Sequence, residues 1–249
     1  MRRLILAVFV LAFGVATAHA STVTFDLNSA GSGANLAGVY TSPYTGTING
    51  GATIPVICDD FADESYIPEA WTAFVTPVSS LSSSTTDSSL KWLDASGSTV
   101  TVDGHALNQA AAYTVAAVLA IDILQSTTGS QAQEDYSYAL WELFDYSDAS
   151  AQLSGYPTDG TNALNDLNAA VTNVETNGLV PSDYSNVTIY SYDAAAGAPT
   201  GACGGPCGPP QEFIAVSTPE PSSLLLLGAG LVGLMILAFR RNLVTVAQE

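Results

Sequence analysis

The chain has 249 residues, of which 47% are hydrophobic, and it carries a net charge of −18. That hydrophobic fraction excludes a disordered chain, and the roughly 200 residues between the two terminal segments suffice for one domain with a core. Lys91 is the only Lys or Arg between residues 21 and 239, and no Gly-rich phosphate loop is followed by Lys, so we expect neither nucleic-acid binding nor a cofactor.

The N-terminus has the pattern of a secretory signal peptide. Met1-Arg2-Arg3 is followed by an apolar run from Leu4 to Val15 and then by Ala18-His19-Ala20. A basic start, an apolar core and a small-x-small site are the three parts of such a peptide. We therefore predict a signal peptide over residues 1–20, with the translocon and signal peptidase as partners and cleavage after Ala20. An uncleaved membrane helix is the alternative, but the apolar run is short for a span.

The next segments alternate in polarity and predict β-strands. Such alternation is clearest at Val23, Phe25 and Leu27. A Ser/Thr-rich surface loop follows at residues 79–89. The strands expected before that loop cover residues 21–27, 38–48 with a bend at Pro43, 52–59 and 71–77.

The middle of the chain changes to a helical period. Three helices are expected, over residues 106–125, 131–146 and 161–178, with Gly178 as a fitting stop. The first is apolar on nearly all sides, which predicts a buried central helix. Strands over residues 186–192 and 211–216 close the pattern. Strands flanking a helical middle indicate a single extracytoplasmic α+β domain over residues 21–200.

Residues 201–218 form a Gly/Pro/Cys-rich loop, the closing strand and a linker. Cys203 and Cys207 are separated by Gly204, Gly205 and Pro206, which permit a tight loop, so we predict a local disulfide between them. Cys usage of this kind fits an oxidising compartment. A structural zinc would need four ligands, and no partner pair is present. Cys58 is left without a partner.

The C-terminus closely resembles the PEP-CTERM sorting signal. Pro219, Glu220 and Pro221 precede an apolar segment over residues 224–239, which Arg240 and Arg241 follow. The segment is just long enough for a transmembrane helix, and the Arg pair marks its cytoplasmic end, leaving residues 242–249 as a cytoplasmic tail. The resemblance implies that an exosortase, a membrane transpeptidase, processes residues 219–241 at the cytoplasmic membrane. A plain tail anchor is the alternative.

A second resemblance concerns Cys58 and Trp141. The segment Ile57-Cys58-Asp59, the alanine-rich helix and Ala139-Leu140-Trp141 resemble thioester domains of bacterial surface adhesins. In that family a Cys thiol condenses with a Gln four residues before the Trp, and the thioester then acylates an amine. Ser137 stands at the Gln position, so the resemblance implies a related fold that has lost the crosslink. The alternative for Cys58 is a buried, inert thiol.

Four acidic residues lie close together after the third predicted strand. Carboxylates at close spacing can hold Ca²⁺, but this spacing fits no EF-hand loop. We interpret the group as a solvated acidic loop and predict no metal site. The four residues, which are only weak calcium candidates, are Asp59, Asp60, Asp63 and Glu64.

The two ends and the acidic composition together indicate an exported cell-envelope protein, anchored in the membrane and then surface-attached or secreted. We expect a non-enzymatic surface or extracellular-matrix protein, associated with exopolysaccharide. One alternative is a covalent adhesin that uses Cys58. The other is a secreted hydrolase, although the sequence has no Gly-x-Ser-x-Gly elbow and a single His outside residues 1–20.

Overall fold

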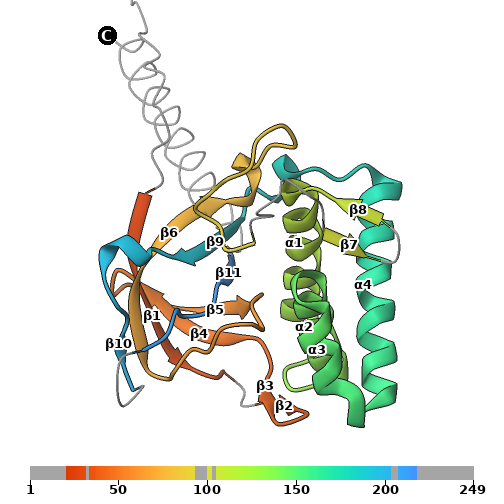
Figure 1. Ribbon diagram of the computed structural model, residues 1–249, viewed down its shortest axis with the longest axis horizontal. Coiled ribbons are helices and arrows are strands. Elements are labelled where there is room, and N and C mark those ends of the chain that lie inside the picture. Colours follow the sequence, from red (N-terminus) through yellow and green to blue (C-terminus); the bar gives the residue numbers. More distant parts are fainter. Residues whose placement is uncertain (1–20, 32–33, 93–99, 103–104, 203–206, 218–249) are drawn as a thin grey trace, which may run out of the picture.

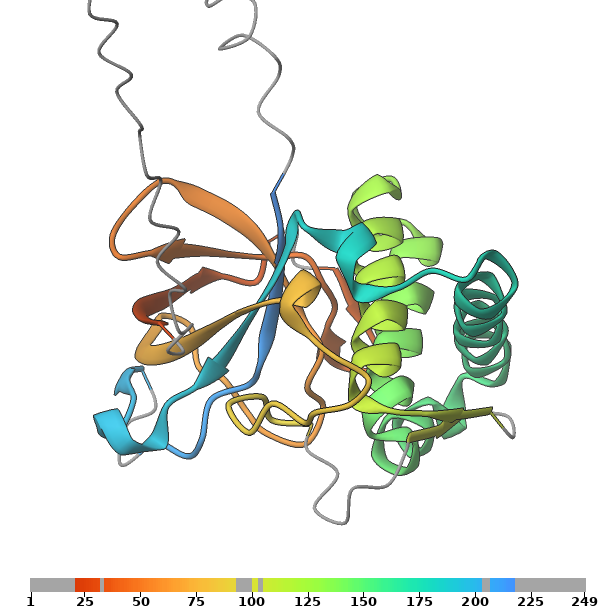
Figure 2. The same ribbon diagram turned by 90° about the horizontal axis from the view of Figure 1, so that it is seen from above.

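A computed structural model describes residues 21–217 except 32–33, 93–99, 103–104 and 203–206. The described chain forms two parts side by side, a β-barrel and a layer of helices (Figure 1). Seen from above, α1 and α2 lie next to the barrel and α4 lies on their far side (Figure 2). The candidate site lies where the barrel meets α1.

Six antiparallel strands form the barrel, and the ring closes because β1 pairs with β6 as well as with β4. In order around the ring they are β1 (Ser21–Ser29), β4 (Tyr44–Ile48), β5 (Thr53–Cys58), β11 (Phe213–Val216), β9 (Val187–Tyr192) and β6 (Glu69–Pro77). Short strands lie outside the ring: β10 (Thr200–Gly201) on β6, and the pairs β2 (Asn35–Leu36) with β3 (Val39–Tyr40) and β7 (Val100–Val102) with β8 (His105–Leu107).

The predicted fold class, an α+β domain with strands flanking a helical middle, is wrong. The strands before and after the helices belong to one closed barrel, in which β9 and β11 are inserted between β5 and β6. Polarity alternation shows that a segment is a strand, but not which strand it pairs with, so the closure was not visible in the sequence.

Alternation along the strands places one row of side chains inside the barrel and the next row outside. The inward row is rich in aromatic rings: Phe25 stacks 5.4 Å from Phe213 and lies 4.7 Å from Trp71 between ring centroids. The outward side chains of β5, β9 and β11 instead join the core formed with the helices, through Ile57, Ile189 and Ile214. The domain therefore has two cores, one that fills the barrel and continues to Tyr138 and Trp141 of α2, and one between the outside of the barrel and the helices.

The helical layer is built around α1 (Gln109–Gln125), most of which is buried. Its many alanines let α2 (Gln131–Phe144) and the barrel pack closely against it. Side chains of Asn108 and Ser130 cap the two N-termini. The other helices are α3 (Tyr146–Gln152), α4 (Pro157–Asn177) and the 3₁₀ turns η1 (Val78–Ser80), η2 (Leu153–Gly155), η3 (Pro181–Tyr184) and η4 (Ala194–Ala196).

Within the part of the chain that the structure describes, no helix has the length and apolar character needed to cross a membrane. The transmembrane helix predicted over residues 224–239, the signal peptide at residues 1–20 and the tail at 242–249 lie outside the described residues.

Candidate functional site

Buried acidic groups gather at one end of the barrel, outside β9 and β11 and against α1. Asp59 and Asp60 follow β5. Glu212 directly precedes β11, which is the strand paired with β5. All three side chains are buried, with exposed fractions of 0%, 0% and 1%. Burial of ionisable groups is costly unless they are paired or neutral, so the partners of each group decide its charge.

Glu212 is the hydrogen-bond acceptor at the centre of the group. Its carboxylate accepts hydrogen bonds from the Tyr113 hydroxyl on α1, from the Ser191 hydroxyl on β9 and, at 2.9 Å, from the backbone N–H of Lys91. Burial raises the pKa of Glu212, and these donors act in the opposite direction by stabilising the ionised form. The Glu212 carboxyl group therefore connects the barrel, α1 and the segment before β7 through hydrogen bonds.

Asp59 lies beside Glu212 and reaches no donor: among the described residues neither of its carboxyl oxygens has a hydrogen-bond partner that could stabilise a charge. Burial, followed by the neighbouring charge of Glu212, raises the pKa of Asp59 well above its usual range. The raised pKa favours the protonated form of Asp59, since two charges in this site would repel each other.

Lys91 supplies the positive charge of the site. Its ammonium group forms an ion pair with Asp60 and, at 2.6 Å, a second with Asp63. Asp60 is fixed further by the backbone N–H groups of Ala62 and Asp63, which donate to Oδ1 at 3.0 and 3.2 Å. Burial acts to lower the pKa of Lys91, but the two carboxylates raise it above the usual value, so Lys91 stays charged.

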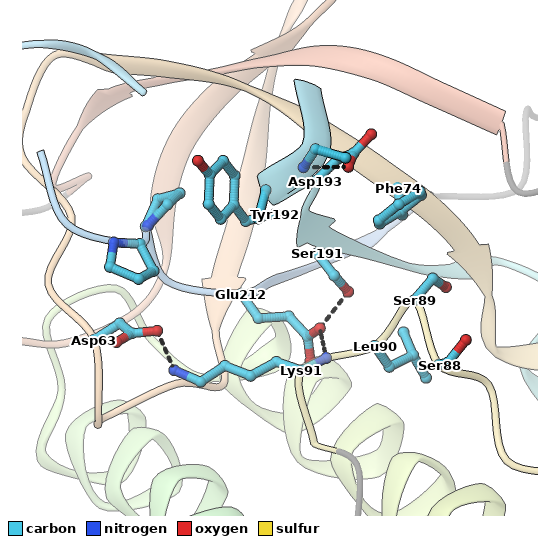
Figure 3. Close-up of a pocket in the computed structure, with 14 residues that line it drawn as sticks. Asp63, Phe74, Ser88, Ser89, Leu90, Lys91, Ser191, Tyr192, Asp193 and Glu212 are labelled. Atoms are coloured by element: carbon cyan, nitrogen blue, oxygen red, sulfur yellow. Dashed lines mark hydrogen bonds and ion pairs between the residues drawn. The ribbon is translucent and has the colours of Figure 1, made fainter. Parts of the chain in front are cut away.

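An open cavity of about 380 Å³ lies over this group, with Glu212 and Lys91 on its floor (Figure 3). Tyr192 and Phe74 provide ring surfaces, and the hydroxyls and carboxylates come from Ser191 of β9 and from connecting segments (Figure 3). The cavity is lined by Asp63, Phe74, Ser88, Ser89, Leu90, Lys91, Ser191, Tyr192, Asp193, Ala194, Ala195, Pro209, Pro210 and Glu212. No group of three or more His, Cys, Asp and Glu in the described part of the chain is arranged to hold a metal ion.

Substituting Asp59→Asn should stabilise the protein, and the gain should grow with pH. Folded Asp59 holds its proton while unfolded Asp, with a pKa of about 3.9, releases it, so the wild type loses about 1.4 kcal/mol per pH unit as pH rises above about 4 toward the raised pKa. An Asn side chain does not titrate and places no second charge beside Glu212. Urea unfolding at several pH values between about 4.5 and 7.5 would measure the difference.

The control is Asp148→Asn, which removes one negative charge at an exposed position of α3. If the free energies of unfolding of Asp59→Asn and Asp148→Asn change with pH in the same way, Asp59 is ionised in the folded protein and the expected protonation of Asp59 is wrong.

Cys58 lies in the barrel interior, fully buried, next to Trp141 of α2. The indole N–H of Trp141 donates to the Cys58 carbonyl at 2.9 Å, and the Cys58 thiol donates to the Asp60 carbonyl at 3.1 Å. Burial raises the pKa of the thiol well above its usual value. The fold therefore brings together the two residues on which the thioester resemblance rests.

The glutamines that precede Trp141 in the sequence do not replace the missing thioester partner. Ser137 is buried, and its hydroxyl donates to the Gln133 carbonyl. The Gln133 side chain donates to the Ile123 carbonyl and accepts from Gly129, so it caps the α1–α2 connection. The Gln131 amide donates to Asp135. Each carboxamide is held within the helical layer.

Of the four acidic residues predicted to form a solvated loop, Asp59 and Asp60 are instead fully buried. Asp63 pairs with Lys91, and Glu64 accepts from the Tyr66 hydroxyl. Glu212 and Tyr113, which join the group from distant positions in the chain, were not predicted. The single Lys in a strongly acidic domain was the one available signal, because a lone cation is the natural partner of a buried acid.

Ser217 is the last described residue and is fastened to the barrel. Its N–H donates to the Asn186 carbonyl at 2.8 Å, and the Asn186 amide donates to the Ser217 carbonyl at 3.3 Å. A family model, described as the PEP-CTERM protein-sorting motif, matches residues 217–242. The chain carries a PEP-CTERM sorting motif.

The PEP-CTERM motif confirms the prediction made from Pro219, Glu220 and Pro221, although those residues and Arg240 and Arg241 lie outside the described part of the chain. It indicates an exported protein that an exosortase sorts to the cell envelope. The predicted Cys203–Cys207 disulfide includes Cys203, which also lies outside the described residues. Searches of curated proteins and of solved structures found no match.

Proposed function

We propose that the exported barrel domain is a non-enzymatic extracellular-matrix protein that binds uncharged saccharide units of an exopolysaccharide. The observation that carries this proposal is the open cavity that combines ring surfaces with hydroxyl and carboxylate groups. Binding sites of this kind combine an apolar surface with a few polar groups that fix orientation.

The chemistry of the cavity favours a sugar ring. Phe74, Tyr192 and Pro209 offer apolar faces to the C–H face of a pyranose. Ser88 and Asp193 offer hydrogen-bonding groups to its hydroxyls. The single cation, Lys91, is already paired with two carboxylates, so a uronic acid or a sulfated sugar would meet net negative charge.

Non-enzymatic binding is supported by how the acids are used. A general acid or base must come within about 3 Å of the proton that it moves. Glu212 is surrounded by three protein donors and Asp60 by Lys91 and backbone N–H groups, so both are committed to the protein itself. The thioester alternative has less support because Ser137 lacks a carboxamide that could condense with Cys58.

Titration of the processed protein with neutral, amino and uronic-acid oligosaccharides, by calorimetry or NMR, tests the proposal. We expect binding of neutral units without cleavage, and we expect Tyr192→Ala to weaken it about tenfold through lost ring contact. Tyr146→Ala, at an exposed tyrosine of α3, is the matched control and should bind like the wild type. Release of shorter oligosaccharides during the titration would show a hydrolase, and equal loss of binding in both variants would remove the cavity as the site.

A further inference from the structure

We infer that the barrel end from which the sorting motif leaves is the surface that docks onto the exosortase. This end, which we call the exit rim, comprises residues 21–24, 49–53, 77–80, 186–187 and 217. The inference rests on the PEP-CTERM motif and does not depend on saccharide binding.

Strand register places these segments together. Val216 pairs with Val187, Thr188 pairs with Pro77, and Val75 pairs with Ser21, which joins β11, β9, β6 and β1 at one end. The β4–β5 hairpin turns at the same end, since Thr47 pairs with Thr53. In Figure 2 the blue end of β11 lies at the top of the barrel, and the cyan segment after β9 lies at the bottom.

The motif begins at the rim with almost no linker. Ser217 is held by its hydrogen bonds to Asn186, and Pro219 is two residues further along the chain. Two residues span at most about 7 Å, so the Pro-Glu-Pro sequence starts within that distance of the folded barrel. An enzyme that acts on the motif while the domain is folded must contact the rim. β1 also begins here, at Ser21, the predicted first residue after signal cleavage.

Charge distinguishes the exit rim from the rest of the domain. None of its side chains is charged, although the chain has 23 Asp and Glu, so after signal cleavage its one charge would be the α-amino group of Ser21. The opposite end holds the acidic group and the cavity, with Asp59, Asp60, Asp63, Glu64, Glu69, Asp193 and Glu212. Protein interfaces are depleted of charge at their centres because an unpaired charge there must be dehydrated. A rim without charged side chains around the exit point suits such a contact, and docking there directs the cavity away from the membrane enzyme.

The test is a pulse-chase assay of processing in a host whose exosortase converts the wild-type chain. Ala52→Asp with Thr53→Asp adds two charges at exposed rim positions. The matched control is Asn28→Asp with Thr200→Asp, which adds two charges at exposed positions of the opposite end. Dehydrating two unpaired charges should slow processing of the rim variant about tenfold or more, whereas the control should keep the wild-type rate.

A second variant separates contact from damage to the fold. Six Gly/Ser residues inserted between Ser217 and Thr218 can move the barrel by up to about 20 Å, so they should restore the rate of the rim variant. The docking inference fails if the rim variant is processed at the wild-type rate, or if the opposite-end control is slowed as much as the rim variant. It also fails if the inserted linker does not restore processing of the rim variant, although the rim variant with and without the linker unfolds at the same temperature as the wild type. Glu220→Ala gauges the motif separately: normal processing of that variant would refute the sorting assignment itself.

Discussion

Replacing Glu212 with alanine should lower the free energy of unfolding by about 3–5 kcal/mol, because three buried donors lose their acceptor. The Tyr113 and Ser191 hydroxyls and the backbone N–H of Lys91 all donate to this carboxylate. Urea unfolding of the variant and the wild type at one pH gives the difference directly.

Glu212→Gln is the control for this prediction. It keeps the volume and one acceptor oxygen but directs an amide N–H₂ toward a donor, so we expect an intermediate loss of about 1–3 kcal/mol. A loss below about 1 kcal/mol for Glu212→Ala would mean that water replaces the carboxylate at no cost, and the group would then not be a structural centre.

Trp141→Ala should destabilise the protein by about 3–5 kcal/mol, since it empties the volume of a large buried ring between α2 and the barrel. The ring lies 5.1 Å from Phe61 and 4.9 Å from Tyr138 between centroids, and its exposed fraction is 1%. Its N–H also satisfies the Cys58 carbonyl. Thermal and urea unfolding would both report the loss.

Trp141→Phe separates packing from hydrogen bonding. It retains most of the ring contacts and leaves the Cys58 carbonyl without its donor, so we expect a cost of about 1–3 kcal/mol. If Trp141→Phe and Trp141→Ala were equally destabilised, the hydrogen bond to β5 would account for the whole effect and the packing argument would be wrong.

Most individual elements could be predicted because their signals are local. The three helices were expected at 106–125, 131–146 and 161–178, and the structure has α1, α2 and α4 there, with Gly178 in the left-handed conformation after α4. The differences lie at the ends: Pro157 at the first position starts α4 earlier than expected, and α2 ends at Phe144 before the separate α3. A strand's period is visible in its own residues, but its partner is not.

The candidate site could be predicted only in part. Asp59 and Asp60 stood out as neighbours in the sequence, whereas Glu212 lies 152 positions from Asp60, to which its backbone N–H donates at 3.2 Å. An acidic run has the same composition whether it is solvated or buried, so the interpretation as a solvated loop could not be corrected without knowing what packs over it. The cavity could not be predicted for the same reason, since its walls come from β6, β9 and four connecting segments.

The sequence by itself determined how this protein is sorted, because an exosortase motif is read as a contiguous stretch and needs no fold. It also determined the acidic character of the domain and the positions of most strands and helices. Only the tertiary structure decided that the strands close into a barrel, that Asp59 is buried beside Glu212, and that the motif leaves from a rim without charged side chains. These properties depend on contacts between residues far apart in the chain. Strand pairing around the barrel and the packing of the barrel against α1 create those contacts.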